Sequence, residues 1–129
     1  MPPEELLYPP HWLRIAEKDL RRVERALRDD DPELAGFCLQ QAVEKFLQGF
    51  LLSRGWKLKR THDPEALGDT CIAHDPTLQE FRAPCQKITG FYVIERYPGV
   101  GTGLTVKEVQ DSLESVRGLV EKLRKATSA

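Results

Sequence analysis

The chain has 129 residues, of which 40% are hydrophobic and 30% are charged, and its formal net charge is −1 at pH 7. This length predicts a single domain over residues 1–129 with its core at about 11–126, and the composition excludes extensive disorder. A balance of 19 basic and 20 acidic residues excludes bulk attraction of nucleic acid as the main activity, although it permits a local basic patch.

The sequence also limits the cellular setting. No run of about 18 apolar residues exists that could span a membrane, and the N-terminus lacks the basic and apolar segments of a secretion signal. Cys38, Cys71 and Cys85 are odd in number and form no Cys-x-x-Cys motif, which favours free thiols in a reducing cytosol. We therefore expect a soluble cytoplasmic protein without a membrane partner.

Helix starts recur along the sequence. Asp31, Asp63 and Asp75 each precede a proline, and aspartate caps a helix N-terminus while proline suits the first helical position. Thr105 with Glu108 forms a further start of the capping-box type. These signals place the starts of four of the five predicted helices.

The first predicted helix spans 11–28 and is amphipathic. One face carries apolar residues at three- and four-residue steps, namely Trp12, Ile15, Ala16, Leu20, Val23 and Leu27. The opposite face carries cations at the same steps, namely Arg14, Lys18, Arg21, Arg25 and Arg28. The interpretation favoured by the sequence alone is a solvated outer face on which Glu17 and Glu24 form ion pairs with the cations.

The second predicted helix spans 32–54 and is apolar over a wide arc, so it is either central to a bundle or pressed against a second subunit. The second alternative is the basis for predicting a homodimer.

Shorter helices follow at 64–73 and from residue 76 to about 94, where Pro84 should kink or break the helix. A last helix at 106–126 carries a three-four apolar seam. Short connectors and the absence of period-two alternation predict an all-α, up-and-down four-helix bundle with an additional short helix.

Two polar segments are candidate phosphate sites. Lys57, Lys59, Arg60 and His62 lie directly before a predicted helix start, where cations and free backbone N–H groups together hold phosphate. The alternative is an ordinary exposed loop. In the second segment, Arg96 beside Tyr97 could grip a nucleotide by charge and stacking, or Arg96 could simply interact with a helix dipole.

A zinc site is the remaining chemical candidate. The cysteine and histidine spacing, namely His62, Cys71, His74 and Cys85, matches no common zinc motif, and Cys71-x-x-His74 is only half of one. The sequence therefore predicts neither a metal site nor a cofactor. No Gly-x-Ser-x-Gly elbow supports a nucleophilic serine.

Four segments in a fixed order carry a family resemblance. Residues 12–20 read W-x-x-x-A-x-x-D-L, and residues 35–45 read A-x-F-x-x-Q-Q-A-x-E-K. Residues 60–63 read Arg-Thr-His-Asp, which is similar to a K-T-H-D motif, and residues 92–98 read Y-x-x-x-R-Y-P. Together these segments resemble the HEPN domain family over about residues 11–125.

The resemblance implies a helical bundle that commonly dimerises, in a small prokaryotic protein often encoded beside a minimal nucleotidyltransferase as a toxin–antitoxin-like pair. It also implies nucleotide binding and, in many members, metal-independent RNA cleavage by an arginine followed after four to six residues by a histidine. Arg96 matches that arginine, but residues 100–103 contain no histidine and none follows His74. Without the imidazole, no general base for a ribose 2′-hydroxyl is evident.

Three hypotheses follow. The favoured one is a non-catalytic HEPN bundle that binds a nucleotide or RNA phosphate at the two polar segments and pairs with a nucleotidyltransferase. The first alternative is a metal-independent ribonuclease toxin in which Arg96 stabilises the phosphorane and His62 acts as base or acid. The second is a non-catalytic adaptor or dimerisation module that uses the apolar faces of the second and last helices.

Overall fold

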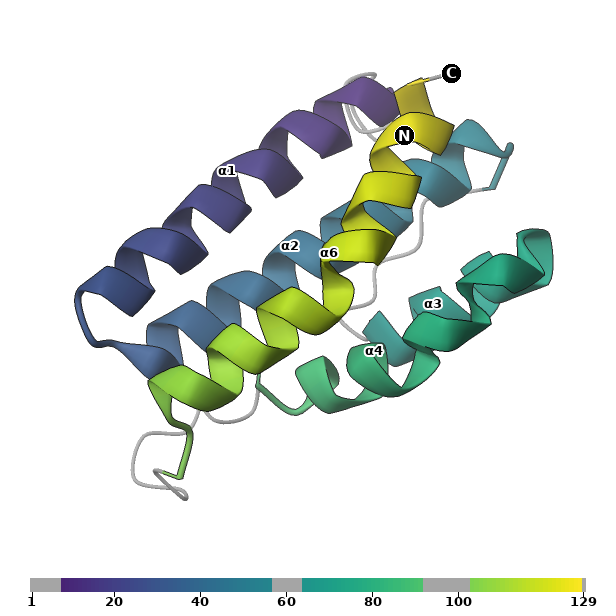
Figure 1. The fold of residues 1–129 in the computed structure, drawn as a ribbon. Coiled ribbons are helices and arrows are strands. Elements are labelled where there is room, and N and C mark those ends of the chain that lie inside the picture. The colour runs from purple at the N-terminus through teal and green to yellow at the C-terminus, as the bar shows by residue number, and fades with distance from the viewer. Residues whose placement is uncertain (1–7, 57–63, 92–102, 129) are drawn as a thin grey trace.

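The computed structural model describes residues 8–56, 64–91 and 103–128, and every element within these ranges is helical (Figure 1). The long helices are α1 (Pro9–Arg28), α2 (Pro32–Ser53) and α6 (Val106–Ser128). The shorter elements are α3 (Pro64–His74), the 3₁₀ helix η2 (Pro76–Phe81) and α4 (Arg82–Thr89). This arrangement confirms the predicted all-α bundle.

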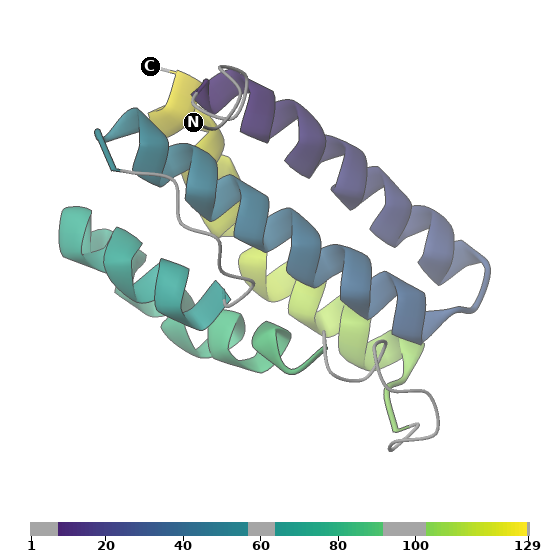
Figure 2. The same cartoon turned by 180° about the vertical axis from the view of Figure 1, so that it is seen from behind.

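Helix α2 lies at the centre of the bundle. Helix α1 packs along one side of the pair formed by α2 and α6, while α3, η2 and α4 form a layer on the other side (Figures 1 and 2). Fourteen of the 22 residues of α2 are buried, and Leu34 is its one large hydrophobic residue that remains exposed. The wide apolar arc of α2 is therefore covered within one chain, and the homodimer remains a prediction without support from this helix.

The predicted helix starts are set by local caps. Asp31 and Thr105 each accept the backbone N–H of the residue three positions on, at 3.2 and 3.1 Å. Asp75 caps η2 in a similar way, through the N–H of the residue two positions on at 3.0 Å. Asp63 lies outside the described residues. Each cap satisfies a backbone donor that the helix itself leaves without a partner.

The predicted fourth helix is two elements joined end to end. The 3₁₀ helix η2 stops at Phe81, and α4 begins at Arg82, so that Pro84 is the third residue of α4. In that first turn the missing N–H of proline removes no intrahelical hydrogen bond, whereas in one continuous helix from residue 76 it would remove one. The prediction was that Pro84 kinks or breaks this helix, and the structure shows a change of helix type between Phe81 and Arg82, before the proline. The predicted residues 92–94 lie outside the described ranges.

Helix α1 approaches α2 closely at Gly49, near the C-terminal end of α2. A Cβ atom on Gly49 would lie 3.2 Å from Cβ of Trp12, 3.5 Å from the carbonyl oxygen of Pro9 and 3.9 Å from Cγ2 of Thr127. The first turn of α1 and the last turn of α6 therefore meet on α2. None of the described helices is both long enough and apolar enough to cross a membrane.

Candidate functional site

All six residues predicted to hold phosphate lie outside the described residues. They fall in two segments, 57–63 and 92–102, and they are Lys57, Lys59, Arg60, His62, Arg96 and Tyr97. The structure describes the residues that flank both segments, and these flanking residues define where the predicted site is attached to the bundle.

The first segment follows the C-terminal end of α2. Gly55 adopts φ +84°, a left-handed conformation that favours glycine, and the N–H of Trp56 then donates to the carbonyl of Leu51 at 3.0 Å. The half-buried Trp56 ring packs against the core and meets His74, at the end of α3, edge to face with a centroid distance of 6.2 Å. This end of the segment is thus fixed between α2 and α3.

The far end of the first segment is tied to the start of the second. The N–H of Glu65, in the first turn of α3, donates to Oγ1 of Thr89 at 3.1 Å. The same hydroxyl donates to the carbonyl of Cys85 at 2.9 Å, so Thr89 links the start of α3 to the end of α4. The chain therefore enters α3 and leaves α4 at neighbouring points.

The second segment is anchored on α2 at both ends. Phe91 and Leu104 are both buried, and both pack over Gly36. A Cβ atom on Gly36 would lie 2.8 Å from Cδ2 of Leu104 and 3.3 Å from Cγ of Phe91, which is too close for any larger residue without a shift of its neighbours. A larger residue at position 36 would therefore require the Leu104 side chain to shift where Phe91 and Leu104 pack on the central helix.

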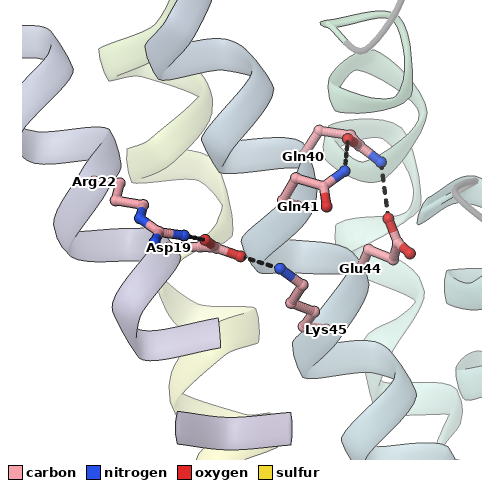
Figure 3. Close-up of polar contacts among 6 residues, drawn as sticks. All are labelled: Asp19, Arg22, Gln40, Gln41, Glu44 and Lys45. Atoms are coloured by element: carbon pink, nitrogen blue, oxygen red, sulfur yellow. Dashed lines mark hydrogen bonds and ion pairs between the residues drawn. The ribbon is translucent and has the colours of Figure 1, made fainter. Parts of the chain in front are cut away.

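A row of buried polar residues begins one turn after Gly36 on α2. Gln40, Glu44 and Gln48 follow at four-residue steps and are all buried. Nε2 of Gln40 donates to Oε2 of Glu44 at 3.1 Å, and Oε1 of Gln40 accepts from Nε2 of Gln41 at 2.8 Å (Figure 3). Burying a carboxylate and amides costs free energy unless they are hydrogen-bonded. The burial of this row therefore indicates that its hydrogen-bond partners lie inside the protein.

The buried polar row was not predicted from the sequence, where Gln40 and Glu44 count only as members of the second family segment. The signal was available, since three polar residues at four-residue steps must share one face of a helix. What the sequence could not show is that this face is turned into the protein rather than toward solvent.

A second polar cluster joins α1 to α2. The Asp19 carboxylate is 4% exposed and accepts from Nζ of Lys45 at 2.5 Å and from Nη1 of Arg22 at 2.8 Å. Figure 3 shows Lys45 directed toward α1, on the side of α2 away from Gln40 and Glu44. The pair between Asp19 and Lys45 spans 26 residues of sequence and links the two helices.

Burial keeps two of the cysteines, Cys71 and Cys85, in the thiol form. Burial raises the pKa of Cys85 to about 12 and raises the pKa of Cys71 still further. Both thiols are therefore protonated at neutral pH, whereas nucleophilic attack and metal binding need the thiolate. Across the described ranges, no three histidine, cysteine or acidic residues lie close enough to hold a metal ion.

The outer faces of α1 and α6 differ in how their charges are paired. On α6, Lys107 pairs with Asp111 at 2.8 Å, and the Asp111 carboxylate raises the pKa of that lysine by hydrogen bonding and by charge. Further pairs along α6 join Arg117 to Glu114 and Lys125 to Glu121. On α1, by contrast, the five cations predicted from the sequence are all exposed, and none forms an ion pair with a described residue.

Comparison with known proteins identifies the family. The model of the HEPN domain matches residues 10–126, which is most of the chain. This chain belongs to the HEPN family. Its fold is similar to that of TT1696 from Thermus thermophilus, with a TM-score of 0.76, and to that of ST0689, an archaeal HEPN homologue, with a TM-score of 0.73. Each is 23% identical to this chain, and each comparison covers 92% of this chain and 97% of the other. No curated protein matches the sequence.

The structure of this HEPN domain brings together two of the four segments that carried the resemblance. Asp19 belongs to the first and Lys45 to the second, and the ion pair between them is one of the contacts that join these segments. The other two contain the predicted phosphate residues and lie outside the described ranges.

Proposed function

We propose that this HEPN-domain protein binds the phosphate groups of a nucleotide or RNA. The binding groups would be the cations and aromatic residue of the two polar segments, namely Lys57, Lys59, Arg60, His62, Arg96 and Tyr97. The observation that supports the proposal is the hydrogen bond from the Glu65 N–H to Thr89 Oγ1, because it attaches the two segments to neighbouring points of the bundle.

Short chain lengths separate the proposed binding groups from that hydrogen bond. His62 lies three residues before Glu65, and Arg96 lies seven residues after Thr89. An extended chain spans about 3.3–3.6 Å per residue, so both segments are long enough to reach a common ligand from this shared attachment point. Cations and an aromatic ring from two segments could then hold one phosphate-bearing ligand by charge and stacking.

We propose that this binding occurs without RNA cleavage. No histidine follows His74 in the sequence, so Arg96 has no imidazole partner at the spacing of the cleaving family members. A positioned general base contributes about 10²–10⁴-fold to rate, and its loss leaves a site that can bind phosphate but lacks the group that activates the 2′-hydroxyl.

By the same family relationship, we propose a homodimer that pairs with a minimal nucleotidyltransferase in a toxin–antitoxin-like module. The apolar residues of α2 and α6 named for the adaptor alternative are mostly buried within the chain, which favours phosphate binding over that alternative. Light scattering at micromolar concentration tests the dimer. Co-expression with a nucleotidyltransferase encoded by a neighbouring gene tests the pairing, and separation of the two proteins on gel filtration would contradict it.

The phosphate site is tested by titrating ATP into the purified protein and into the double variant Arg60→Ala/Arg96→Ala. Loss of two charge-assisted hydrogen bonds, each worth about 1.5–3 kcal/mol, should weaken binding more than tenfold. The matched control is Arg117→Ala/Lys125→Ala, which removes the same charge from the outer face of α6 and should leave the affinity unchanged. Equal affinity in the wild type and the double variant would show that the site is wrong.

Cleavage is tested separately with a mixed RNA pool incubated without metal. We expect the RNA to remain intact at high protein concentration. Degradation that disappears in His62→Ala would instead establish the ribonuclease alternative.

A further inference from the structure

The outer face of α1 carries five cations in one line. We call this set the basic row, and its members are Arg14, Lys18, Arg21, Arg25 and Arg28. Successive members are separated by four or three residues, which keeps all five within an arc of about 80° around the helix and spreads them over about 21 Å of its length. All five are exposed.

The basic row points directly away from the bundle. The buried residues of α1, namely Ala16, Asp19, Val23 and Ala26, lie on the opposite side of the same helix. A straight ligand could therefore contact the whole row without meeting another element of the fold.

The acidic residues of α1 do not neutralise this row. Asp19 is turned inward and bound by Lys45 and Arg22, while Glu17 receives two hydrogen bonds from the Arg124 guanidinium of α6. Glu24 is exposed beside the row and forms no ion pair with a described residue. Asp29 and Asp30 follow Arg28 and are exposed, so two further acids lie at the C-terminal end of the row. Between Arg14 and Arg28, two of the three acids are bound elsewhere, and the five like charges in a line make a strip of positive potential on a chain whose net charge is −1.

A groove of about 530 Å³ between α1 and α6 bounds the basic row on one side. Three carboxylates line it, from Glu24, Asp111 and Glu114, together with the guanidinium groups of Arg28 and Arg117. The excess of carboxylates disfavours a polyanion there, which confines the binding surface to α1.

We propose that the basic row binds the phosphodiester backbone of a polynucleotide. A ligand that engages all five cations must be extended over about 21 Å and carry negative charge along its whole length, as a nucleic-acid strand does and a mononucleotide does not. Four of the five cations are arginines, whose planar guanidinium binds phosphate through two parallel hydrogen bonds. The basic row shares no residue with the proposed nucleotide site, and neither proposal depends on the other.

The test measures fluorescence anisotropy of a labelled 20-nucleotide single-stranded RNA, and of DNA of the same sequence, across a salt series. The variant is Arg21→Gln/Arg25→Gln/Arg28→Gln. The matched control is Lys107→Gln/Arg117→Gln/Lys125→Gln, which removes three exposed cations from α6. A second variant, Arg21→Lys/Arg25→Lys/Arg28→Lys, keeps the charge.

We expect the glutamine variant of the basic row to bind RNA at least tenfold more weakly and to lower the slope of log K against log salt by about 2, because about 0.7 counterions are released per phosphate of a single strand. The α6 control should lose less than threefold, and the lysine variant should keep the salt slope. Binding to RNA but not DNA would identify a contact to the 2′-hydroxyl in addition to phosphate and would support the proposal.

Two outcomes would overturn the proposal. One is an equal loss of RNA affinity in the α1 and α6 glutamine variants, since that would reflect bulk charge alone. The other is competition by a poly-glutamate peptide as effective as competition by unlabelled RNA of equal charge, since that would assign the row to an acidic protein. Binding of ATP should be unchanged in the row variant, so a failure here is distinguishable from a failure of the nucleotide site.

Discussion

Helices α1 and α6 are both long, amphipathic and peripheral, yet they differ in whether the charged side chains of their outer faces form ion pairs. On α6, acids and bases alternate and pair along the helix, as Lys107 does with Asp111 and Glu121 with Lys125. On α1, the acids Asp19 and Glu17 are bound by groups from α2 and α6, and the outer cations are left without ion pairs among the described residues. The direction in which a few acids point therefore decides whether a helix surface is neutral or strongly positive.

The difference has an energetic consequence. Opposite charges three or four residues apart stabilise a helix by about 0.2–0.5 kcal/mol per pair, and like charges destabilise it by similar amounts. The basic row contains four such like-charge neighbours, whereas the corresponding positions of α6 hold favourable pairs. These like-charge neighbours disfavour the helical state of α1, whereas the pairs on α6 favour that of α6.

The largest expected effect on the free energy of unfolding concerns the inward-facing carboxylate of Asp19 on α1. Lys45→Met should destabilise the fold by about 3 kcal/mol, because it leaves the buried Asp19 carboxylate without its partner on α2. Urea unfolding measures the change. Arg22→Met is the control, since this half-exposed arginine lies on the same helix as Asp19, and it should cost less than about 1 kcal/mol. Equal losses would mean that the inward acid is not what joins α1 to α2.

The contact between α1 and α6 should have a smaller effect. Glu17→Gln removes the carboxylate that accepts from both Nε and Nη2 of Arg124, and we expect a loss of about 1 kcal/mol in unfolding free energy. Glu114→Gln, which removes a pair within α6 only, should cost less than about 0.5 kcal/mol. The contrast between α1 and α6 would be weakened if the order of these two values were reversed.

Charge reversal should change stability in opposite directions on the two helices. Lys18→Glu places an acid one turn from Arg14 and Arg21 and should stabilise the protein by about 0.5 kcal/mol at low salt. Glu121→Lys, which replaces a favourable partner of Arg124 and Lys125, should destabilise it by about the same amount. Thermal melts at low salt and in about 1 M NaCl check both signs, because screening should remove both effects.

The smallest effect concerns a single titration on α6. Asp111 raises the pKa of Lys107, so Asp111→Asn should lower that pKa, which NMR titration of the lysine side chain measures. A raised lysine pKa favours the folded state below the ordinary pKa of about 10.4, and this contribution is lost as the pH rises through the folded value. An unchanged pKa in the variant would show that the pair on α6 does not form in solution.

The fold was predictable from sequence because its signals are local. The caps at Asp31 and Thr105 act within one turn, and the helices begin where these residues predict. The apolar arc of the second helix left two alternatives, and the structure selects the central position. The division of the fourth helix at Phe81 was foreseen only as a consequence of Pro84, since the position of a break depends on packing as well as on proline.

The polar sites were less predictable because they depend on contacts between distant residues. Asp19 and Lys45 both belong to segments of the family resemblance, but their ion pair spans 26 residues and forms only when two helices pack. The role of the Cys71 and His74 half-motif also depends on contacts with residues distant in sequence. Cys71 is buried and directs its thiol to the Leu47 carbonyl, while the exposed His74 packs against Trp56.

The two glycines of α2 have a consequence for chain connectivity. At Gly49 the beginning of α1 meets the end of α6, and at Gly36 the end of the α4 region meets the approach to α6. A circular permutant that joins Thr127 to Pro9 through a short linker, with new termini opened between Phe91 and Leu104, would keep every helix in its present place. We therefore expect the arrangement of the helices in space to be independent of their order along the polypeptide, because the packing around the central helix is sufficient to specify that arrangement.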